Sequence, residues 1–143
     1  DTLTLGLRPS PYIEPPVRVT SSLVPSKRFP LRNASDYHFG TYTRVASPCK
    51  AGDYILFTFE EPVDCESVDL RTGIPNVTRY IVTKGRVAWS SDGRSFIEAG
   101  PLNESGQIVG KPHKPVRAIR VSIEGSNGET AVCWQDLRIT PTR

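Results

Sequence analysis

The sequence predicts a small all-β domain, because short apolar runs alternating with polar residues are separated throughout by turn residues. The clearest case spans residues 87–97, where an Asp92-Gly93 turn signal lies between runs that contain Trp89 and Phe96. Asp and Gly tolerate the positive φ values that tight hairpin turns need. Strands at this spacing, with no helical pattern longer than a turn or two, are typical of a β-sandwich or β-barrel.

The strands can be placed in order along the chain. In the strand over residues 54–59, the alternate residues Ile55, Phe57 and Phe59 are apolar and share one face, as in a half-buried strand. The region from Pro25 to Lys50 has few alternating apolar residues, so we expect a long loop region there, where β domains often carry function. The expected strands are residues 17–20, 54–59, 63–70, 80–82, 87–90, 95–99, 116–123 and 132–139.

Length and composition favour one soluble domain. The chain has 143 residues, of which 37% are hydrophobic, and a net charge of +3 from basic residues dispersed along it. This dispersal argues against a nucleic-acid partner, and no apolar stretch is long enough to span a membrane. We expect an N-terminal strand and proline-rich connector at residues 1–16 and a β-domain at 17–143. Since methionine is absent even at position 1, we also expect a mature product or an excised piece of a longer protein.

The three cysteines, Cys49, Cys65 and Cys133, leave two alternatives open. There is no CxxC spacing and there are only two histidines, which argues against a zinc site. Cys65 and Cys133 lie on expected strands and could form a disulfide across the core, which would indicate an oxidising compartment. Alternatively, all three are small buried thiols.

Catalytic residues are not expected. A glycosidase needs two carboxylates placed across the scissile bond, but Glu60 and Glu61 are adjacent and point to opposite faces of an extended chain. His113 lies in an exposed loop bracketed by prolines, with no catalytic motif around it. The sequence contains no nucleophile elbow, P-loop or dinucleotide fingerprint.

Four segments in the right order resemble discoidin domains, also called coagulation factor V/VIII type C domains. They are residues 51–63, 89–96, 115–121 and 134–139, and the resemblance covers about residues 17–140. The residues of these segments are most similar to those of C-terminal modules of bacterial β-N-acetylhexosaminidases of the chitobiase type. Those modules are related to family 32 carbohydrate-binding modules. The resemblance implies a jelly-roll β-sandwich of about eight antiparallel strands. It also implies a secreted or periplasmic bacterial parent enzyme.

The resemblance further implies a structural calcium site. The family often carries it on an Ala-x-Asp-Gly-Asp-x-x-Thr stretch, which corresponds here to residues 34–41. Asp36 and Thr41 match that stretch, and Asp136 stands where the family places a closing acidic ligand. His38 replaces the second Asp, and the loss of one carboxylate weakens a site for a hard cation.

The family binds ligands with loops at one end of the sandwich, and the region from Pro25 to Lys50 is expected to form part of that end. Sugar recognition uses aromatic faces for stacking and polar donors for reading hydroxyl and N-acetyl oxygens. Trp134, near the start of the last expected strand, is a further stacking candidate, whereas Trp89 lies within a hairpin strand and is expected in the core. The ligand-binding candidates are Tyr37, His38, Phe39, Tyr42, Arg44 and Trp134.

These expectations lead to two function hypotheses. The first is a non-catalytic accessory domain that binds N-acetylhexosamine- or galactose-type glycan ends near the catalytic domain of the same polypeptide. The second is a structural or protein-interaction module that packs on the catalytic domain without binding sugar. The solvent exposure of the aromatic side chains distinguishes the two hypotheses. Aromatic residues that bind a ligand are exposed in a shallow concavity, whereas a module that only packs on another domain buries them.

Overall fold

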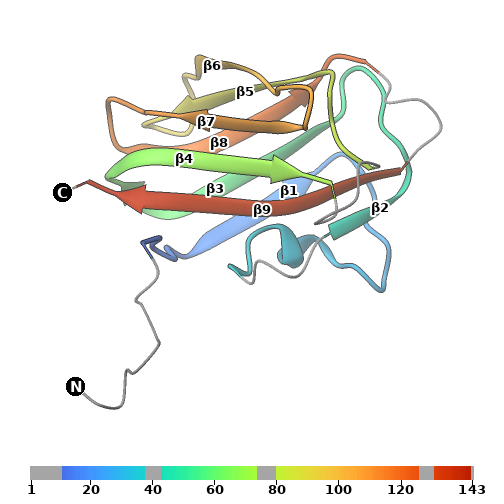
Figure 1. Cartoon of the computed structure of the whole chain (residues 1–143). Helices are drawn as coiled ribbons and strands as arrows, with labels where there is room; N and C mark the ends of the chain where they lie inside the picture. The colour runs from blue at the N-terminus through green and yellow to red at the C-terminus, as the bar shows by residue number, and fades with distance from the viewer. Residues whose placement is uncertain (1–10, 38–42, 74–79, 126–130, 143) are drawn as a thin grey trace.

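The chain folds into two antiparallel β-sheets packed face to face, which confirms the all-β sandwich (Figure 1). The structure, a computed structural model, describes residues 11–37, 43–73, 80–125 and 131–142, without the side chains of residues 46, 47, 131, 135 and 136. These residues form nine strands and one short 3-10 helix. No helix in this part of the chain is both long and apolar enough to cross a membrane.

The two sheets are built from strands that are mostly not consecutive in sequence. In spatial order, the five-stranded sheet contains β1 (Val17–Ser21), β3 (Tyr54–Val63), β8 (Val116–Ile123), β5 (Gly85–Ser90) and β6 (Ile97–Pro101). The four-stranded sheet contains β2 (Thr43–Pro48), β9 (Ala131–Pro141), β4 (Cys65–Thr72) and β7 (Gln107–Gly110). The 3-10 helix η2 (Leu31–Ala34) lies beside β9, β2 and β1.

The core lies between the sheets because alternate residues of each strand point inward. Ile55, Phe57 and Phe59 of β3 are at most 1% exposed, whereas Tyr54 on the same strand is 38% exposed. This confirms the face predicted from the period of two. Ile13 also contributes, because it pairs with Ile139 of β9 and packs against the core.

Two local predictions were wrong, and one strand was not predicted. The region from Pro25 to Lys50 contains η2 and the edge strand β2, and Pro25 forms a bridge to Val45. Residues 80–82 do not form a strand: Tyr80 has a φ of +69°, and the amide of Val82 donates to the Thr72 hydroxyl (2.9 Å) rather than to a ladder partner. β7 was not predicted, since its four residues include only two apolar side chains.

The hairpin around Asp92 is also wider than predicted, since residues 91–96 form a loop between β5 and β6. The exposed Asp92 carboxylate accepts hydrogen bonds from the Ser90 hydroxyl (2.9 Å) and from the amides of Arg94 and Ser95 (both 2.8 Å). The backbone amides, chiefly that of Ser95, lower the pKa of Asp92 to about 2. The loop is held on the outer face of its sheet, with the Phe96 ring 4.2 Å from the Arg120 guanidinium carbon.

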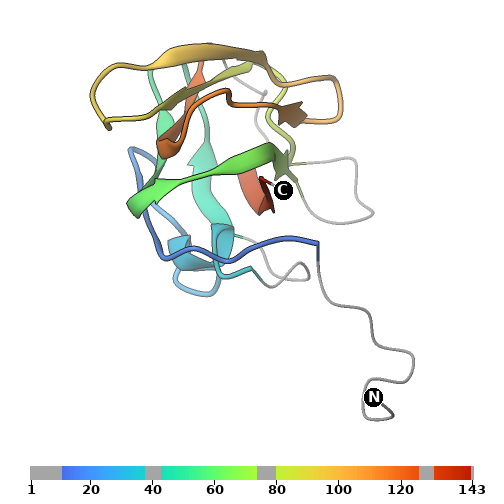
Figure 2. The same ribbon diagram turned by 90° about the vertical axis from the view of Figure 1, so that its left-hand side faces the viewer.

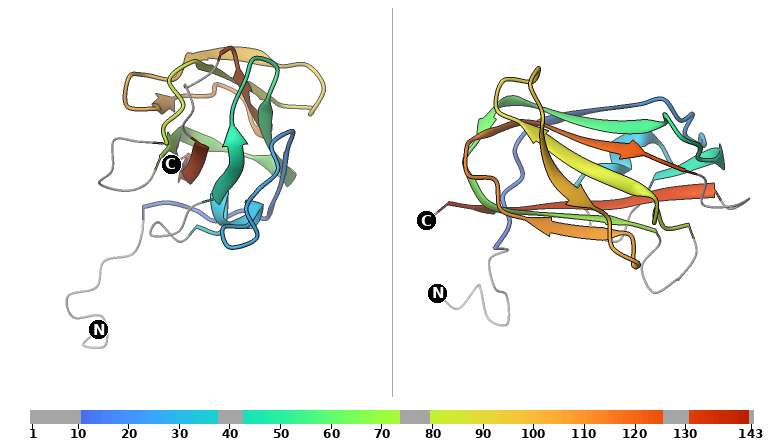
Figure 3. Two further views of the ribbon diagram at one scale, coloured as in Figure 1. Left: turned by 90° about the vertical axis from the view of Figure 1, so that its right-hand side faces the viewer. Right: turned by 90° about the horizontal axis from the view of Figure 1, so that it is seen from above.

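The sandwich has two distinct ends. β9 finishes at the C-terminal end, which faces the viewer in Figure 2 and also carries the β3–β4 junction and residues 111–115 between β7 and β8. The opposite end, called the β2 end here, carries the turn at residues 49–53, the end of β4 at Thr72 and the start of β9 (Figure 3, left).

Candidate functional site

Arg44 and Tyr80 form a stacked pair at the β2 end. The Arg44 guanidinium carbon lies 5.1 Å from the centre of the Tyr80 ring, and both residues are half-buried. Such a cation–π contact stabilises by about 0.5–1 kcal/mol at a partly exposed position. The pair combines an aromatic ring with a multiple hydrogen-bond donor, which is the chemistry that sugar recognition requires.

The backbone of both residues is anchored to neighbouring elements. Arg44 pairs with Cys133 across β2 and β9, and its amide donates to the Phe29 carbonyl (3.4 Å). The Tyr80 carbonyl accepts from the Cys133 amide (2.9 Å). β9 therefore brings together two residues that are 36 positions apart in the sequence. Tyr80 was not among the predicted site residues, because only the tertiary pairing places it beside Arg44.

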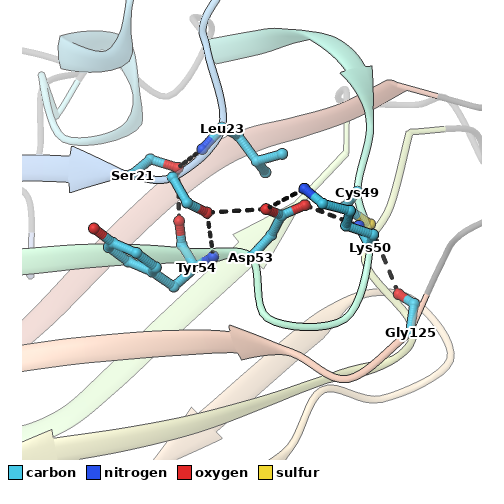
Figure 4. Close-up of polar contacts among 8 residues, drawn as sticks. Ser21, Leu23, Cys49, Lys50, Asp53, Tyr54 and Gly125 are labelled. Atoms are coloured by element: carbon cyan, nitrogen blue, oxygen red, sulfur yellow. Dashed lines mark hydrogen bonds and ion pairs between the residues drawn. The ribbon is translucent and has the colours of Figure 1, made fainter.

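A buried carboxylate fixes the turn at this end (Figure 4). Asp53 is 4% exposed and accepts hydrogen bonds from the Lys50 amide (2.9 Å), the Lys50 ammonium (3.1 Å) and the Ser22 hydroxyl (3.1 Å). Burial by itself raises the pKa of Asp53, but the hydrogen bonds from Lys50 and Ser22 together hold it below its usual value. The turn is thus tied to the segment after β1.

Tyr37 lies away from the Arg44–Tyr80 pair. Its φ is +60°, and its hydroxyl donates to the Pro15 carbonyl (2.7 Å) in the segment that leads to β1. Burial, followed by the nearby charge of Glu14, raises the pKa of the Tyr37 hydroxyl well above its usual value. The Tyr37 hydroxyl therefore links the bend after η2 to the segment before β1. The other aromatic and histidine candidates of this segment, His38, Phe39 and Tyr42, lie outside the described residues.

Trp134 is not at the surface. It lies within β9, it is 1% exposed, and its neighbours in the two flanking strands are Thr43 and Thr72. Both faces of β9 are covered at this point, since Cys133, whose side chain points to the opposite face from Trp134, is also fully buried. The Trp134 ring has no face open to a ligand, so the sequence-based candidate is corrected to a core residue. Trp89, expected in the core, packs against it but is only half-buried.

The three cysteines are free and buried, which decides between the two alternatives left by the sequence. Cys65 pairs with Pro141 near the finish of β9, whereas Cys133 lies near the start of the same strand. The length of β9 thus separates the two thiols that could have formed a disulfide. Burial raises the pKa of both thiols to about 11, so both are protonated and unreactive at neutral pH.

Of the three predicted calcium ligands, only the side chain of Asp36 is among the described residues. Asp36 is half-buried in the bend after η2, whereas Thr41 and the Asp136 side chain lie outside the described residues. Among the side chains that are described, no three His, Cys, Asp or Glu residues lie close enough together to hold a metal ion.

No protein family matches the sequence, and no curated protein is similar to it at a significant level. Solved structures, in contrast, match it over most of its length. A family 32 carbohydrate-binding module from a family 31 glycoside hydrolase of Clostridium perfringens has a TM-score of 0.70 at 14% identity, covering 92% of this chain and 99% of that module. A chitosan-binding module of a Paenibacillus chitosanase/glucanase has a TM-score of 0.69 at 12% identity, covering 90% and 97%.

A third similar structure is the family 32 module of Clostridium perfringens NanJ, solved in complex with galactose. Its TM-score is 0.65 at 11% identity, and the match covers 86% of this chain and 92% of that module. In each case the match extends over nearly the whole of the other module, so the likeness concerns the complete sandwich rather than a shared fragment. This chain has the β-sandwich fold of the family 32 carbohydrate-binding modules.

Proposed function

We propose that this chain is a non-catalytic carbohydrate-binding domain that takes a glycan end at the β2 end of the sandwich. The observation that carries the proposal is the match to the Clostridium family 32 module over nearly the whole of both chains. The half-exposed Arg44–Tyr80 pair supports it, because it supplies a ring face and donors at one place.

The candidate contacts are Arg44, Tyr80 and the preceding residues His38, Phe39 and Tyr42, which lead directly into β2. The ligand is a single glycan end with an N-acetylhexosamine- or galactose-type terminus. One similar module was solved with galactose and another with GalNAc-β-1,3-galactose, which supports this choice. Binding by such a module is weak, since a mono- or disaccharide buries little surface.

The parent protein in this proposal is a secreted or periplasmic bacterial glycoside hydrolase, specifically a β-N-acetylhexosaminidase of the chitobiase type. The resemblance of the four sequence segments supports that specific choice, whereas the similar modules that belong to family 31 and family 89 glycoside hydrolases support only a glycoside hydrolase parent. The domain would raise the effective concentration of glycan ends near the active site of the catalytic domain, without chemistry of its own.

We also propose that the domain binds a structural calcium ion. Asp36, Thr41 and Asp136 would hold it, and backbone carbonyls would complete the oxygen ligands. A ligand that binds only the folded state raises the melting temperature by mass action. We therefore expect a higher melting temperature in calcium than in chelator, measured by differential scanning fluorimetry. Equal melting temperatures, with no heat of calcium binding in calorimetry, would remove calcium from the proposal.

A packing module that binds no sugar is the second candidate. The observation that favours it is that two predicted ligand contacts, Tyr37 and Trp134, have roles inside the domain. Under this alternative, the Arg44–Tyr80 surface would contact another protein domain.

A glycan screen with the wild type and the Arg44→Ala variant separates the two candidates. We expect the wild type to bind N-acetylhexosamine or galactose termini. Arg44→Ala should bind at least about 10-fold more weakly, since hydrogen bonds to a charged group are each worth about 1.5–3 kcal/mol. Arg18→Ala, which removes an exposed arginine on β1 of the other sheet, is the matched control and should bind as the wild type does. A wild type that binds none of these termini would favour the packing module.

A further inference from the structure

A second concave surface lies at the C-terminal end, around residues 111–115, which cross from β7 in one sheet to β8 in the other. Two hollows adjoin this segment, and residues 112–115 line both of them. Pro112 is buried while His113 and Lys114 are exposed. The ring of each proline fixes its backbone φ, so the segment holds an imidazole and an ammonium group on a stiff backbone.

The larger hollow has a volume of about 490 Å³, and Asp64, Glu66 and Thr142 line it together with residues 111–115. Sites for small molecules have volumes of about 300–1,000 Å³. The carboxylates of Asp64 and Glu66 accept hydrogen bonds, whereas Lys111 and Lys114 donate them. Because donors and acceptors face the same space, a neutral polyhydroxylated ligand suits the hollow better than an anion.

The smaller hollow, of about 120 Å³, shares residues 112–115 with the larger one and is lined mainly by apolar atoms, including those of Trp89 and Ile97. Ile97 is 60% exposed and Trp89 is half-buried. β7 supports the indole from one side: a Cβ added at Gly110 would lie only 2.3 Å from Cη2 of Trp89. The hollow is therefore a preformed apolar notch with an aromatic wall, beside a polar groove.

We propose that the two hollows together form a second glycan site, specific for an N-acetylated hexose. The sugar ring lies in the larger hollow, where its hydroxyls meet Asp64, Glu66 and Lys114. The acetamido methyl group enters the smaller hollow beside Trp89. The proposal takes its ligand class from the function proposed above, but its residues are separate, because they lie at the C-terminal end and include neither Arg44 nor Tyr80. Two sites at opposite ends would let one domain hold two glycan ends and so gain avidity on a surface.

The test is a titration followed by ¹⁵N–¹H correlation spectra with GlcNAc, GalNAc and glucose, each up to about 10 mM, which would largely saturate a site of about 1 mM affinity. The chain has two tryptophans, so two indole N–H signals report separately on Trp89 and on the buried Trp134. A Trp89→Phe variant assigns them. We expect both N-acetylated sugars to shift the Trp89 signal and the amides of residues 111–115, while glucose, which lacks the acetamido group, shifts them at least about 5-fold less.

Two variants lower the affinity at this site if the proposal is right. His113→Ala and Ile97→Asp should each raise the Kd by about 5-fold, since each removes about one polar or apolar contact. Val109→Asp is the matched control for Ile97→Asp, because Val109 is 66% exposed on the adjacent strand of the other sheet and lines neither hollow. The Kd of the Val109→Asp variant for the sugar should equal that of the wild type.

The outcomes separate this site from the one at the β2 end. Shifts at Trp89 that persist in Arg44→Ala support a separate second site. Shifts near Arg44 without any at Trp89 overturn the second site and leave the proposed function intact. Loss of the Trp89 shifts in Arg44→Ala would mean that they report binding at the β2 end, and this also overturns the second site. A spectrum unchanged by all three sugars overturns the second site, and a spectrum that galactose also leaves unchanged contradicts the proposed function as well.

Discussion

Asp53→Ala should lower the free energy of unfolding by about 3 kcal/mol, because it removes a buried acceptor and leaves its donors unpaired. The carboxylate is 4% exposed and accepts from the Lys50 amide and the Ser22 hydroxyl. The Ser22 hydroxyl in turn accepts from the amide of Tyr54 (2.9 Å), at the start of β3 (Figure 4). Without Asp53, the turn at residues 49–53 loses its link to the segment after β1.

The same carboxylate makes stability depend on pH. Since the pKa of Asp53 is lower in the folded protein than in the unfolded chain, its contribution is present above the unfolded value, about pH 3.9. That contribution is lost as the pH falls through the folded pKa. We therefore expect the wild type to lose stability below about pH 4 and Asp53→Asn, which cannot titrate, to lose less.

Urea unfolding at pH 7 and at pH 3, followed by circular dichroism, measures both effects. Asp92→Ala is the control, since the Asp92 carboxylate also accepts amide hydrogen bonds but is exposed to solvent, which should make the loss smaller than for Asp53→Ala. Equal losses for Asp53→Ala and Asp92→Ala would contradict the structural role of the buried acceptor.

Gly106→Ala is the second change with a large expected effect, a loss of about 3 kcal/mol in the free energy of unfolding. Gly106 has a φ of +72°, and a Cβ there would lie 2.3 Å from the Thr72 hydroxyl oxygen and 2.9 Å from Cβ of Ile81. Thr72 cannot move freely: it is 4% exposed, and its hydroxyl donates to the Gly106 carbonyl (2.8 Å) and accepts from the Val82 amide (2.9 Å).

A second glycine separates backbone strain from the steric clash. Gly52 has a φ of +95°, but a Cβ there would meet nothing within 4 Å, so Gly52→Ala should cost only about 1 kcal/mol. Thermal unfolding of both variants gives the difference. Because Val82 follows Tyr80 closely, Gly106→Ala should also weaken glycan binding at the β2 end in a titration. Equal stabilities for the two variants would show that the junction of Thr72, Gly106 and Val82 is not tightly packed.

The strands of the core could be predicted because their burial alternates with a period of two. Ile55 and Phe57 of β3 are at most 1% exposed, as their alternate positions in the sequence indicated. β2 was missed because the buried side chains described in it, Thr43 and Val45, include one that is polar. Thr43 is satisfied inside the protein by donating to the Pro30 carbonyl (2.8 Å), a contact that pattern analysis cannot anticipate.

The candidate sites were harder to predict than the fold, because their residues come from distant parts of the chain. Arg44 was identified from its own segment, but its partner Tyr80 is placed by pairing with Cys133. His113 was dismissed as part of an exposed loop without a motif, and it is indeed exposed. The hollows beside it have walls from β4, β5 and the end of β9, which no local pattern brings together.

The most direct test of the central claim is a glycan screen of the wild-type domain, with affinities then measured by isothermal titration calorimetry. The account predicts binding to N-acetylhexosamine or galactose termini with a Kd of about 0.1–1 mM, as expected for so small a ligand. Binding should be specific for those termini and should weaken in Arg44→Ala. A folded wild type that binds none of these termini at about 10 mM would contradict the assignment of this sandwich as a carbohydrate-binding domain.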